Sequence, residues 1–175
     1  MAQRLDTAVN ISILATCAIV VVTLVPRFMS GWRSSPRNET SQLLVPGDRI
    51  PALVSNRTDK SLVLAWRSDC RYCAESAPFY RKLAQLVRER RELLSLVVMT
   101  TDAEQPSVDA LQRLGIPVSA IVSISPEQQR QQYRVPGTPT LIAMDSRGLV
   151  EKVWFGKLSD DRQREVFEFI SQLKQ

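Results

Sequence analysis

The sequence contains no histidine among its 175 residues. Histidine is the commonest metal ligand and the commonest general base, so its absence excludes catalytic sites of the Ser-His-Asp, Cys-His and HExxH kinds. Strong charge is missing as well, since the net charge is +5 and the arginines are scattered along the chain. Without a basic stripe or a motif that mixes basic and aromatic residues, we expect no nucleic-acid partner.

Cysteine is scarce, with three residues in the whole chain, but two of them stand three positions apart in the stretch WRSDCRYC. Cys70 and Cys73 could bind a metal, form a structural disulfide or exchange electrons with another protein. A zinc site needs about four ligands, and the third cysteine, Cys17, lies in a separate apolar segment, so we expect no metal. A structural disulfide across two residues closes too small a loop to add much stability. Electron exchange is therefore the favoured interpretation of the pair.

The amino-terminal segment is a long apolar run. Residues 7–26, TAVNISILATCAIVVVTLVP, carry no charge. A helix of about 20 residues spans about 30 Å, the thickness of a hydrocarbon core, so we predict a transmembrane anchor in contact with membrane lipid. A cleaved signal peptide and a lipoprotein signal ending at Cys17 are the alternatives. They fit less well, because Val25 to Phe28 make a poor cleavage site and Thr16 is an unusual residue before a lipidated cysteine.

The orientation of this anchor is ambiguous. Arg4 alone precedes the apolar run, whereas Arg27, Arg33 and Arg37 follow it. The positive-inside rule would then place the carboxyl-terminal domain in the cytoplasm. Residues 27–45 are polar and serine-rich, and we interpret them as a tether between the anchor and a folded domain.

The rest of the chain alternates apolar runs and amphipathic stretches, which predicts an α/β fold. The pattern implies a mixed sheet with helices on both faces. In chain order, the expected elements are strand 61–66, helix 74–91, strand 93–99, helix 108–114, strand 119–124, helix 125–133, strand 140–144, strand 149–155 and a last helix capped by Ser159.

The cysteine pair falls where strand 61–66 ends and helix 74–91 begins. Free backbone N–H groups at a helix start stabilise negative charge, and the thiolate is the nucleophilic form of cysteine. Arg71 adds a nearby positive charge, which Asp69 opposes. We expect Cys70 to be the exposed attacking thiol and Cys73 to resolve the mixed disulfide.

Several motifs together resemble a known family. They are Cys70-Arg-Tyr-Cys73 after a strand, Pro78 five residues beyond, Val135-Pro-Gly-Thr-Pro139-Thr before another strand, and the opening Gly47-Asp-Arg-Ile-Pro51. With the anchor, the chain resembles the membrane-tethered TlpA/ResA-type thiol–disulfide oxidoreductases over residues 46–175. The resemblance implies a thioredoxin-like fold, a central mixed β-sheet flanked by helices, with an N-terminal transmembrane helix. It also implies no cofactor beyond a redox-active disulfide.

The resemblance assigns roles to single residues. Cys70 is implied as the nucleophile and Cys73 as the resolving thiol. Pro139 matches the cis-proline that lies against the disulfide, and Thr138 before it could offer its backbone to an extended substrate strand. Pro78 matches a proline that kinks the active-site helix.

The sequence also departs from this family. Asp69 stands where tryptophan is usual, and the Arg71-Tyr72 pair is not one of the best-known dipeptides between the cysteines. Leu64 occupies the position of a buried acid in thioredoxins, so Glu75 is a candidate acceptor for the proton of Cys73. A glutamate in the first turn of a helix is alternatively a surface residue that complements the helix dipole. We expect Trp66 to be core or pocket wall.

These features together predict a membrane-anchored disulfide reductase or exchange protein. Its partners would be protein thiols and disulfides and an upstream membrane or periplasmic electron donor. By the resemblance, it would sit in the cytoplasmic membrane with a single span and its catalytic domain on the extracytoplasmic side. A peroxiredoxin-like peroxidase is one alternative, although Arg67 stands where such enzymes have threonine. A non-enzymatic copper or thiol assembly factor is another.

Overall fold

The computed structural model describes residues 43–53 and 58–173 of the chain. Its helices and strands, in chain order, are β1 (Lys60–Ala65), α2 (Arg71–Glu75), α3 (Ala77–Glu89), β2 (Leu94–Thr100), α4 (Glu104–Arg113), β3 (Ala120–Ser123), α5 (Pro126–Gln131), β4 (Thr140–Asp145), β5 (Val150–Phe155) and α6 (Asp160–Ser171). The predicted anchor, residues 7–26, lies outside the described residues, as does the tether up to residue 42. In the described ranges, none of the helices has the length and apolar character needed to cross a bilayer.

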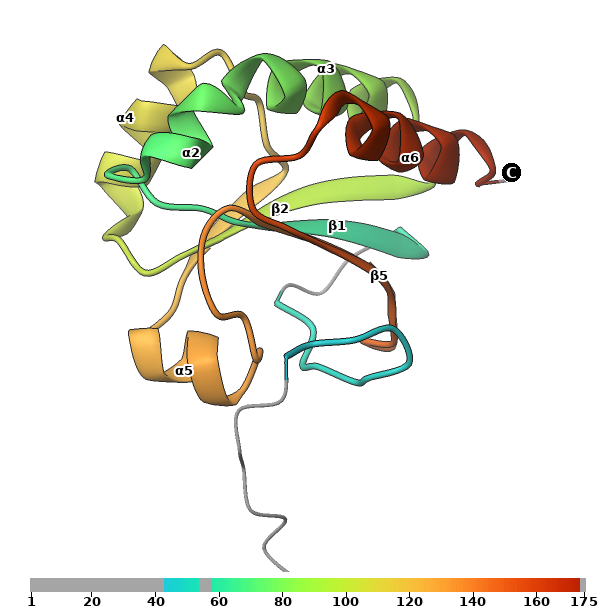
Figure 1. Ribbon diagram of the computed structural model, residues 1–175, viewed down its shortest axis with the longest axis horizontal. Coiled ribbons are helices and arrows are strands. Elements are labelled where there is room, and N and C mark those ends of the chain that lie inside the picture. The colour runs from blue at the N-terminus through green and yellow to red at the C-terminus, as the bar shows by residue number, and fades with distance from the viewer. Residues whose placement is uncertain (1–42, 54–57, 174–175) are drawn as a thin grey trace, which may run out of the picture. The chain divides into compact units, whose positions relative to one another are not determined.

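The strands form one mixed sheet in the order β3-β2-β1-β4-β5. β1 and β2 run parallel, as do β2 and β3, whereas β4 is antiparallel to both β1 and β5. The crossovers from β1 to β2 and from β2 to β3 step in the same direction, so right-handed connections put their helices on one face of the sheet. Figure 1 shows α2, α3, α4 and α6 on that face and α5 on the other.

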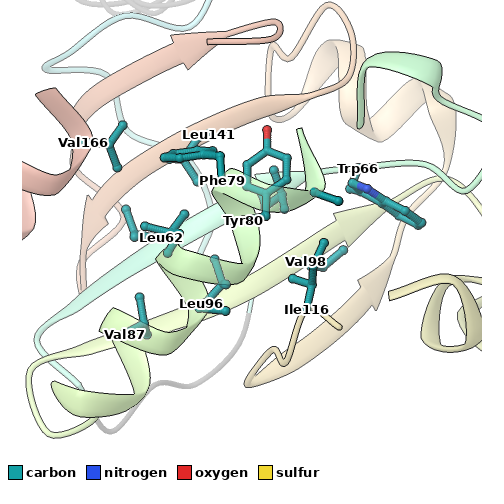
Figure 2. Close-up of a cluster of buried hydrophobic side chains, with 14 of the residues drawn as sticks. Leu62, Trp66, Phe79, Tyr80, Val87, Leu96, Val98, Ile116, Leu141 and Val166 are labelled. Carbon is teal, nitrogen blue, oxygen red and sulfur yellow. The ribbon is translucent and has the colours of Figure 1, made fainter. Parts of the chain in front are cut away.

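A core fills the space between the sheet and the larger helical layer. Side chains from β1, β2, β4, α3 and α6 meet there, as Figure 2 shows for Leu62, Leu96, Leu141, Phe79 and Val166. All seven residues of β2, and five of the six in β1, are buried. Continuous apolar runs of this kind are typical of strands covered on both faces, which explains why these two were recognisable in the sequence.

A second core lies on the opposite face of the sheet. Leu44 and Ile50 pack there with Tyr133, Val135 and the inward residues of β1, β4 and β5. The segment that carries Leu44 is fastened by backbone hydrogen bonds, from Gly47 N–H to the Val150 carbonyl (2.8 Å) and from Leu44 N–H to the Arg134 carbonyl (3.3 Å). Leu44, which the sequence assigned to the end of the tether, is therefore packed in the core of the folded domain.

The predicted α/β architecture and the order of its elements are confirmed, but helix 74–91 is wrong as a single element. The chain makes two helices, α2 and α3, separated at Ser76. Pro78 accounts for the break, because it has no N–H to donate to the Ala74 carbonyl and its ring would clash with that carbonyl in a continuous helix.

The predicted helix 108–114 is also wrong at its start, since α4 begins at Glu104. Pro106 lies in the first turn of this helix, where a backbone donor is not needed. The other boundaries agree with the prediction to within about two residues, which is the ordinary uncertainty of helix and strand ends.

Candidate active site

The cysteine pair lies at the junction of β1 and α2. Cys70 is the N-cap of α2, and Cys73 is the third residue of the helix. The two are joined by a disulfide, with their Cα atoms 5.2 Å apart. Cys70 is half-buried, whereas Cys73 is 0% exposed and packs in the main core with Trp66. An approaching molecule can therefore reach the sulfur of Cys70 but not that of Cys73.

The start of α2 directs a backbone donor at the outer sulfur. The N–H of Cys73 points at the Sγ of Cys70 over 3.1 Å, so the sulfur occupies the place that a serine or aspartate oxygen fills at other helix starts. When the disulfide is reduced, the same N–H is positioned to stabilise a thiolate on Cys70. The local backbone thus favours negative charge on the accessible sulfur.

The loop before β4 faces the same sulfur. The Thr138–Pro139 peptide bond is cis, and the carbonyl oxygen of Thr138 lies 3.4 Å from the Sγ of Cys70. Cys70 and Thr138 are 68 positions apart in the chain. They meet because β1 and β4 are neighbouring strands, and Ala65 at the end of β1 pairs with Thr140 at the start of β4. Pro139 is buried and Thr138 half-buried beside the disulfide.

The cis-proline loop is held from three directions. The Thr140 hydroxyl donates to the Gly137 carbonyl (2.8 Å), and the Gly156 N–H after β5 donates to the Pro139 carbonyl (2.8 Å). On the side of α5, the Val135 N–H donates to the Gln129 carbonyl (3.0 Å). These bonds hold the loop in place. Among the described residues, none of the hydrogen bonds has the Thr138 N–H as its donor.

Glu75 joins the helix of the cysteines to the end of β5. Its carboxylate accepts from Lys157 Nζ (2.8 Å) and from Arg71 Nε (2.7 Å). Lys157 follows Gly156, which bonds to Pro139, so this ion pair connects the two halves of the site. The Lys157 ammonium, and next the Arg71 guanidinium, hold the pKa of Glu75 below its ordinary value. A carboxylate paired in this way is a weak proton acceptor, which favours a structural role for Glu75.

Glu75 is also not a first-turn residue, contrary to the sequence-based expectation. α2 begins at Arg71 and ends at Glu75, because the sulfur of Cys70 caps the helix and the chain breaks at Ser76. The helix dipole therefore does not explain a glutamate at this position. Its two cationic partners do.

The other predicted site residues divide into exposed and buried ones. Tyr72 is 57% exposed, and the Arg71 side chain is 85% exposed next to the disulfide. Trp66 is buried in the core, where its indole N–H has no hydrogen-bond partner. Arg71 and Tyr72 are thus available to a bound partner. Trp66 belongs to the core in which Cys73 is buried.

The sequence interpretation missed two contributors, Lys157 and Asp102. Asp102 follows β2, and its carboxylate accepts from the Ser68 N–H (2.6 Å) in the turn that leads into Cys70. A signal for Asp102 was present, because the carboxyl ends of the parallel strands β1 and β2 meet at one edge of the sheet. For Lys157 no local signal exists, since its pairing with Glu75 depends on where β5 ends.

Metal ligands are not grouped in the part of the chain that the structure describes. Within residues 43–53 and 58–173, no three side chains of the cysteine, aspartate and glutamate types come together to hold an ion.

Comparison with known proteins identifies the fold. No protein-family model matches this sequence, and no curated protein is significantly similar to it. Solved structures do match. The thioredoxin domain of a thiol-disulfide oxidoreductase from Bacteroides vulgatus is 18% identical, with 73% of this chain and 99% of that chain covered and a TM-score of 0.57. A thiol:disulfide interchange protein from a Bacteroides species is 18% identical over 75% of this chain and 94% of that chain, with a TM-score of 0.59.

A third similar structure comes from Mycobacterium tuberculosis. It is a secreted disulfide oxidoreductase described as homologous to E. coli DsbE. It is 15% identical over 66% of this chain and 82% of that chain, with a TM-score of 0.51. At these identities the likeness establishes a thioredoxin-like fold with a mixed sheet, as the sequence motifs predicted.

Proposed function

We propose that this protein is a thiol–disulfide oxidoreductase that reduces or exchanges disulfides of other proteins through Cys70 and Cys73. The observation that carries the proposal is the geometry around one sulfur. Cys70 Sγ is accessible, receives the Cys73 N–H at 3.1 Å, and lies 3.4 Å from the carbonyl before the cis-proline. Three structures of similar fold bear names that describe thiol–disulfide chemistry, which supports the same conclusion.

The reaction follows from the different burial of the two sulfurs. In the reduced protein, the Cys70 thiolate attacks one sulfur of a partner's disulfide, which forms a mixed disulfide and releases one partner thiolate. The Cys73 thiolate then attacks the Cys70 sulfur and releases the second partner thiolate. The protein ends with the Cys70–Cys73 disulfide, and two electrons have passed to the partner. In the opposite direction, the same steps oxidise a partner dithiol.

The exposed groups around Cys70 would contact the partner. Thr138 offers its backbone beside the disulfide, and Arg71 and Tyr72, which follow Cys70 on α2, expose a cation and an aromatic ring. An extended partner segment could bond to the backbone of Thr138 while its own sulfur approaches Cys70. The return of the oxidised protein to the reduced state would use electrons from an upstream membrane or periplasmic donor.

The cellular arrangement is part of the same proposal. Residues 7–26 would anchor the chain in the cytoplasmic membrane, residues 27–42 would form a tether, and the folded domain, which includes Leu44, would act on the extracytoplasmic side. The secreted Mycobacterium protein of similar fold supports this side of the membrane, although the arginines after the apolar run oppose it. A reporter that works only outside the cytoplasm should be active when it is fused to the carboxyl terminus. Activity of a fused reporter that works only inside the cytoplasm would reverse the assigned orientation.

The activity itself is tested with insulin as a general disulfide substrate. The full-length protein in detergent should accelerate the reduction of insulin by dithiothreitol, and Cys70→Ser should reduce the rate to that of dithiothreitol alone. Peroxide consumption or tight retention of Cu(I), without insulin reduction, would instead support the peroxidase or the copper-assembly interpretation and contradict the proposal.

A further inference from the structure

Arg67 lies between two carboxylates in the turn that leads into Cys70. The turn is closed by a hydrogen bond from the Cys70 N–H to the Arg67 carbonyl (3.3 Å). Arg67 Nη2 contacts the Asp69 carboxylate at 2.6 Å, and its Nε lies 3.8 Å from the Asp102 carboxylate. Asp102 reaches this turn from the end of β2 and also accepts from the Ser68 N–H (2.6 Å).

Both carboxylates oppose negative charge on the neighbouring sulfur. Asp69 precedes Cys70 directly, so their Cα atoms are about 3.8 Å apart. Asp102 is bound to the backbone two residues before Cys70, and its side chain is 17% exposed, so its charge is only partly screened by water. A like charge at such a position disfavours the thiolate.

The charged side chains of α2 and of the stretch after β5 have the reverse balance, with two cations and one carboxylate. The two cations, Arg71 and Lys157, share the single carboxylate of Glu75. Excess negative charge near Cys70 would therefore come from the turn that contains Asp69 and from Asp102, which is bound to that turn. Arg67 is the cation that contacts both of these carboxylates.

We propose that Arg67 is a positioning residue that compensates the charges of Asp69 and Asp102 and so preserves the reactive thiolate of Cys70. This role deepens the proposed function and rests on it, since it concerns the sulfur that would attack the partner. It assigns a purpose to three residues for which the redox motif alone gives none.

The test measures how readily Cys70 loses its proton. In the full-length protein, Cys17→Ser and Cys73→Ser leave Cys70 as the only thiol, because the chain has three cysteines. The rate of alkylation by iodoacetamide is then measured against pH. This rate follows the fraction of Cys70 present as thiolate, so the midpoint of its pH dependence reports the pKa of the Cys70 thiol. Alkylation needs no partner protein. The proposed role of Arg67 can therefore be contradicted while insulin reduction is observed, and it can be supported while insulin reduction is absent.

In this background, Arg67→Gln should raise the midpoint by about 0.5 pH unit, the size expected for one charge several ångströms away at a partly exposed site. Asp69→Asn should lower it by a similar amount. The Arg67→Gln, Asp69→Asn pair should return the midpoint close to that of the parent, because the net charge of the turn is restored. Arg67→Lys, which keeps the charge, should stay near the parent as well.

Arg147→Gln is the matched control. Arg147 pairs with Asp145 at the other end of β4, about 17 Å along the strand from Thr140, and its loss should leave the midpoint unchanged. The proposal is overturned if Arg67→Gln leaves the midpoint unchanged or lowers it, or if Arg67→Lys shifts it as much as Arg67→Gln. If Arg67→Gln does not fold, Asp69→Asn decides alone, since an unchanged midpoint there contradicts the compensation.

Discussion

Burial separates two cysteines that are otherwise identical in chemistry. The helix of Cys73 turns its sulfur into the core, whereas the sulfur of Cys70 remains at the surface as the cap of that helix. The order of attack in the proposed reaction follows from this difference alone. The residues around the pair then adjust how reactive the outer sulfur is and how firmly the two halves of the site are held.

Glu75 gives a prediction about pH at the scale of one residue. Its pKa is lowered in the folded protein, so its contribution to stability is present above its ordinary pKa and is lost as the pH falls through the folded value. Glu75→Gln should therefore lower the melting temperature by a few degrees at most at pH 7, since the side chains of Lys157 and Glu75 are 50% and 32% exposed and water weakens their attraction.

The difference in melting temperature between the wild type and Glu75→Gln should shrink as the pH is lowered below the ordinary pKa of a glutamate and through the lowered pKa of Glu75 in the folded protein. Glu168→Gln, on an exposed position of α6, serves as the comparison. A difference for Glu75→Gln that persists unchanged into acid would show that the ion pair is not its cause.

At the scale of elements, α5 carries the chain from the edge of the sheet to the cis-proline loop. Its start is well specified, because the Ser125 hydroxyl accepts from the Gln128 N–H (3.0 Å) and the Gln128 side chain accepts from the Ser125 N–H (2.9 Å). Gln129 of the same helix bonds to both backbone groups of Val135. The position of the loop thus depends on a six-residue helix that has little else to stabilise it.

Ser125→Ala should destabilise the protein by about 1 kcal/mol, the usual cost of losing a capping side chain. Ser159→Ala provides the matched control, because Ser159 occupies the same position at α6 but makes no hydrogen bond through its side chain. Urea denaturation of the two variants measures the difference. Equal losses would mean that the capping box of α5 does not contribute as the structure indicates.

The sequence predicted best those features that depend on a single helix, strand or short motif. The buried runs of β1 and β2, the capping box at Ser125 and the cysteine spacing are local features, and all were recognised. The resemblance led us to expect a kink at Pro78, but the separation into two helices at Ser76 was not predicted, because helical periodicity continues across Pro78. The contact of Lys157 with Glu75 was not predictable, because only the tertiary fold brings the end of β5 to α2. The contact of Asp102 with the turn was missed although the parallel pairing of β1 and β2 gave a signal for it.

At the scale of the whole domain, residues 43–50 are fastened to the second core. Leu44 is 1% exposed among Tyr133 and Val135, and Asp48 pairs with Arg134 at 3.0 Å. This segment contacts the stretch that leads from α5 to the cis-proline loop. A chain that begins at residue 46 would lack Leu44 and leave part of that core exposed.

Leu44→Ala should therefore cost about 2–4 kcal/mol of folding free energy, the range for a buried leucine that leaves a cavity. Leu43→Ala is the matched control, since Leu43 is 52% exposed and its loss should cost little. Chemical denaturation of both variants gives the comparison. Equal and small effects would contradict the packing of this segment on the domain.

The most direct test of the account identifies the sulfur that a partner disulfide captures. Cys73→Ser and Cys70→Ser are each reduced, mixed with insulin and analysed by mass spectrometry after proteolysis. We predict that Cys73→Ser accumulates a mixed disulfide at Cys70, and that Cys70→Ser forms none at the buried Cys73. A mixed disulfide at Cys73 of comparable yield, or none at Cys70, would contradict the assignment of Cys70 as the attacking sulfur.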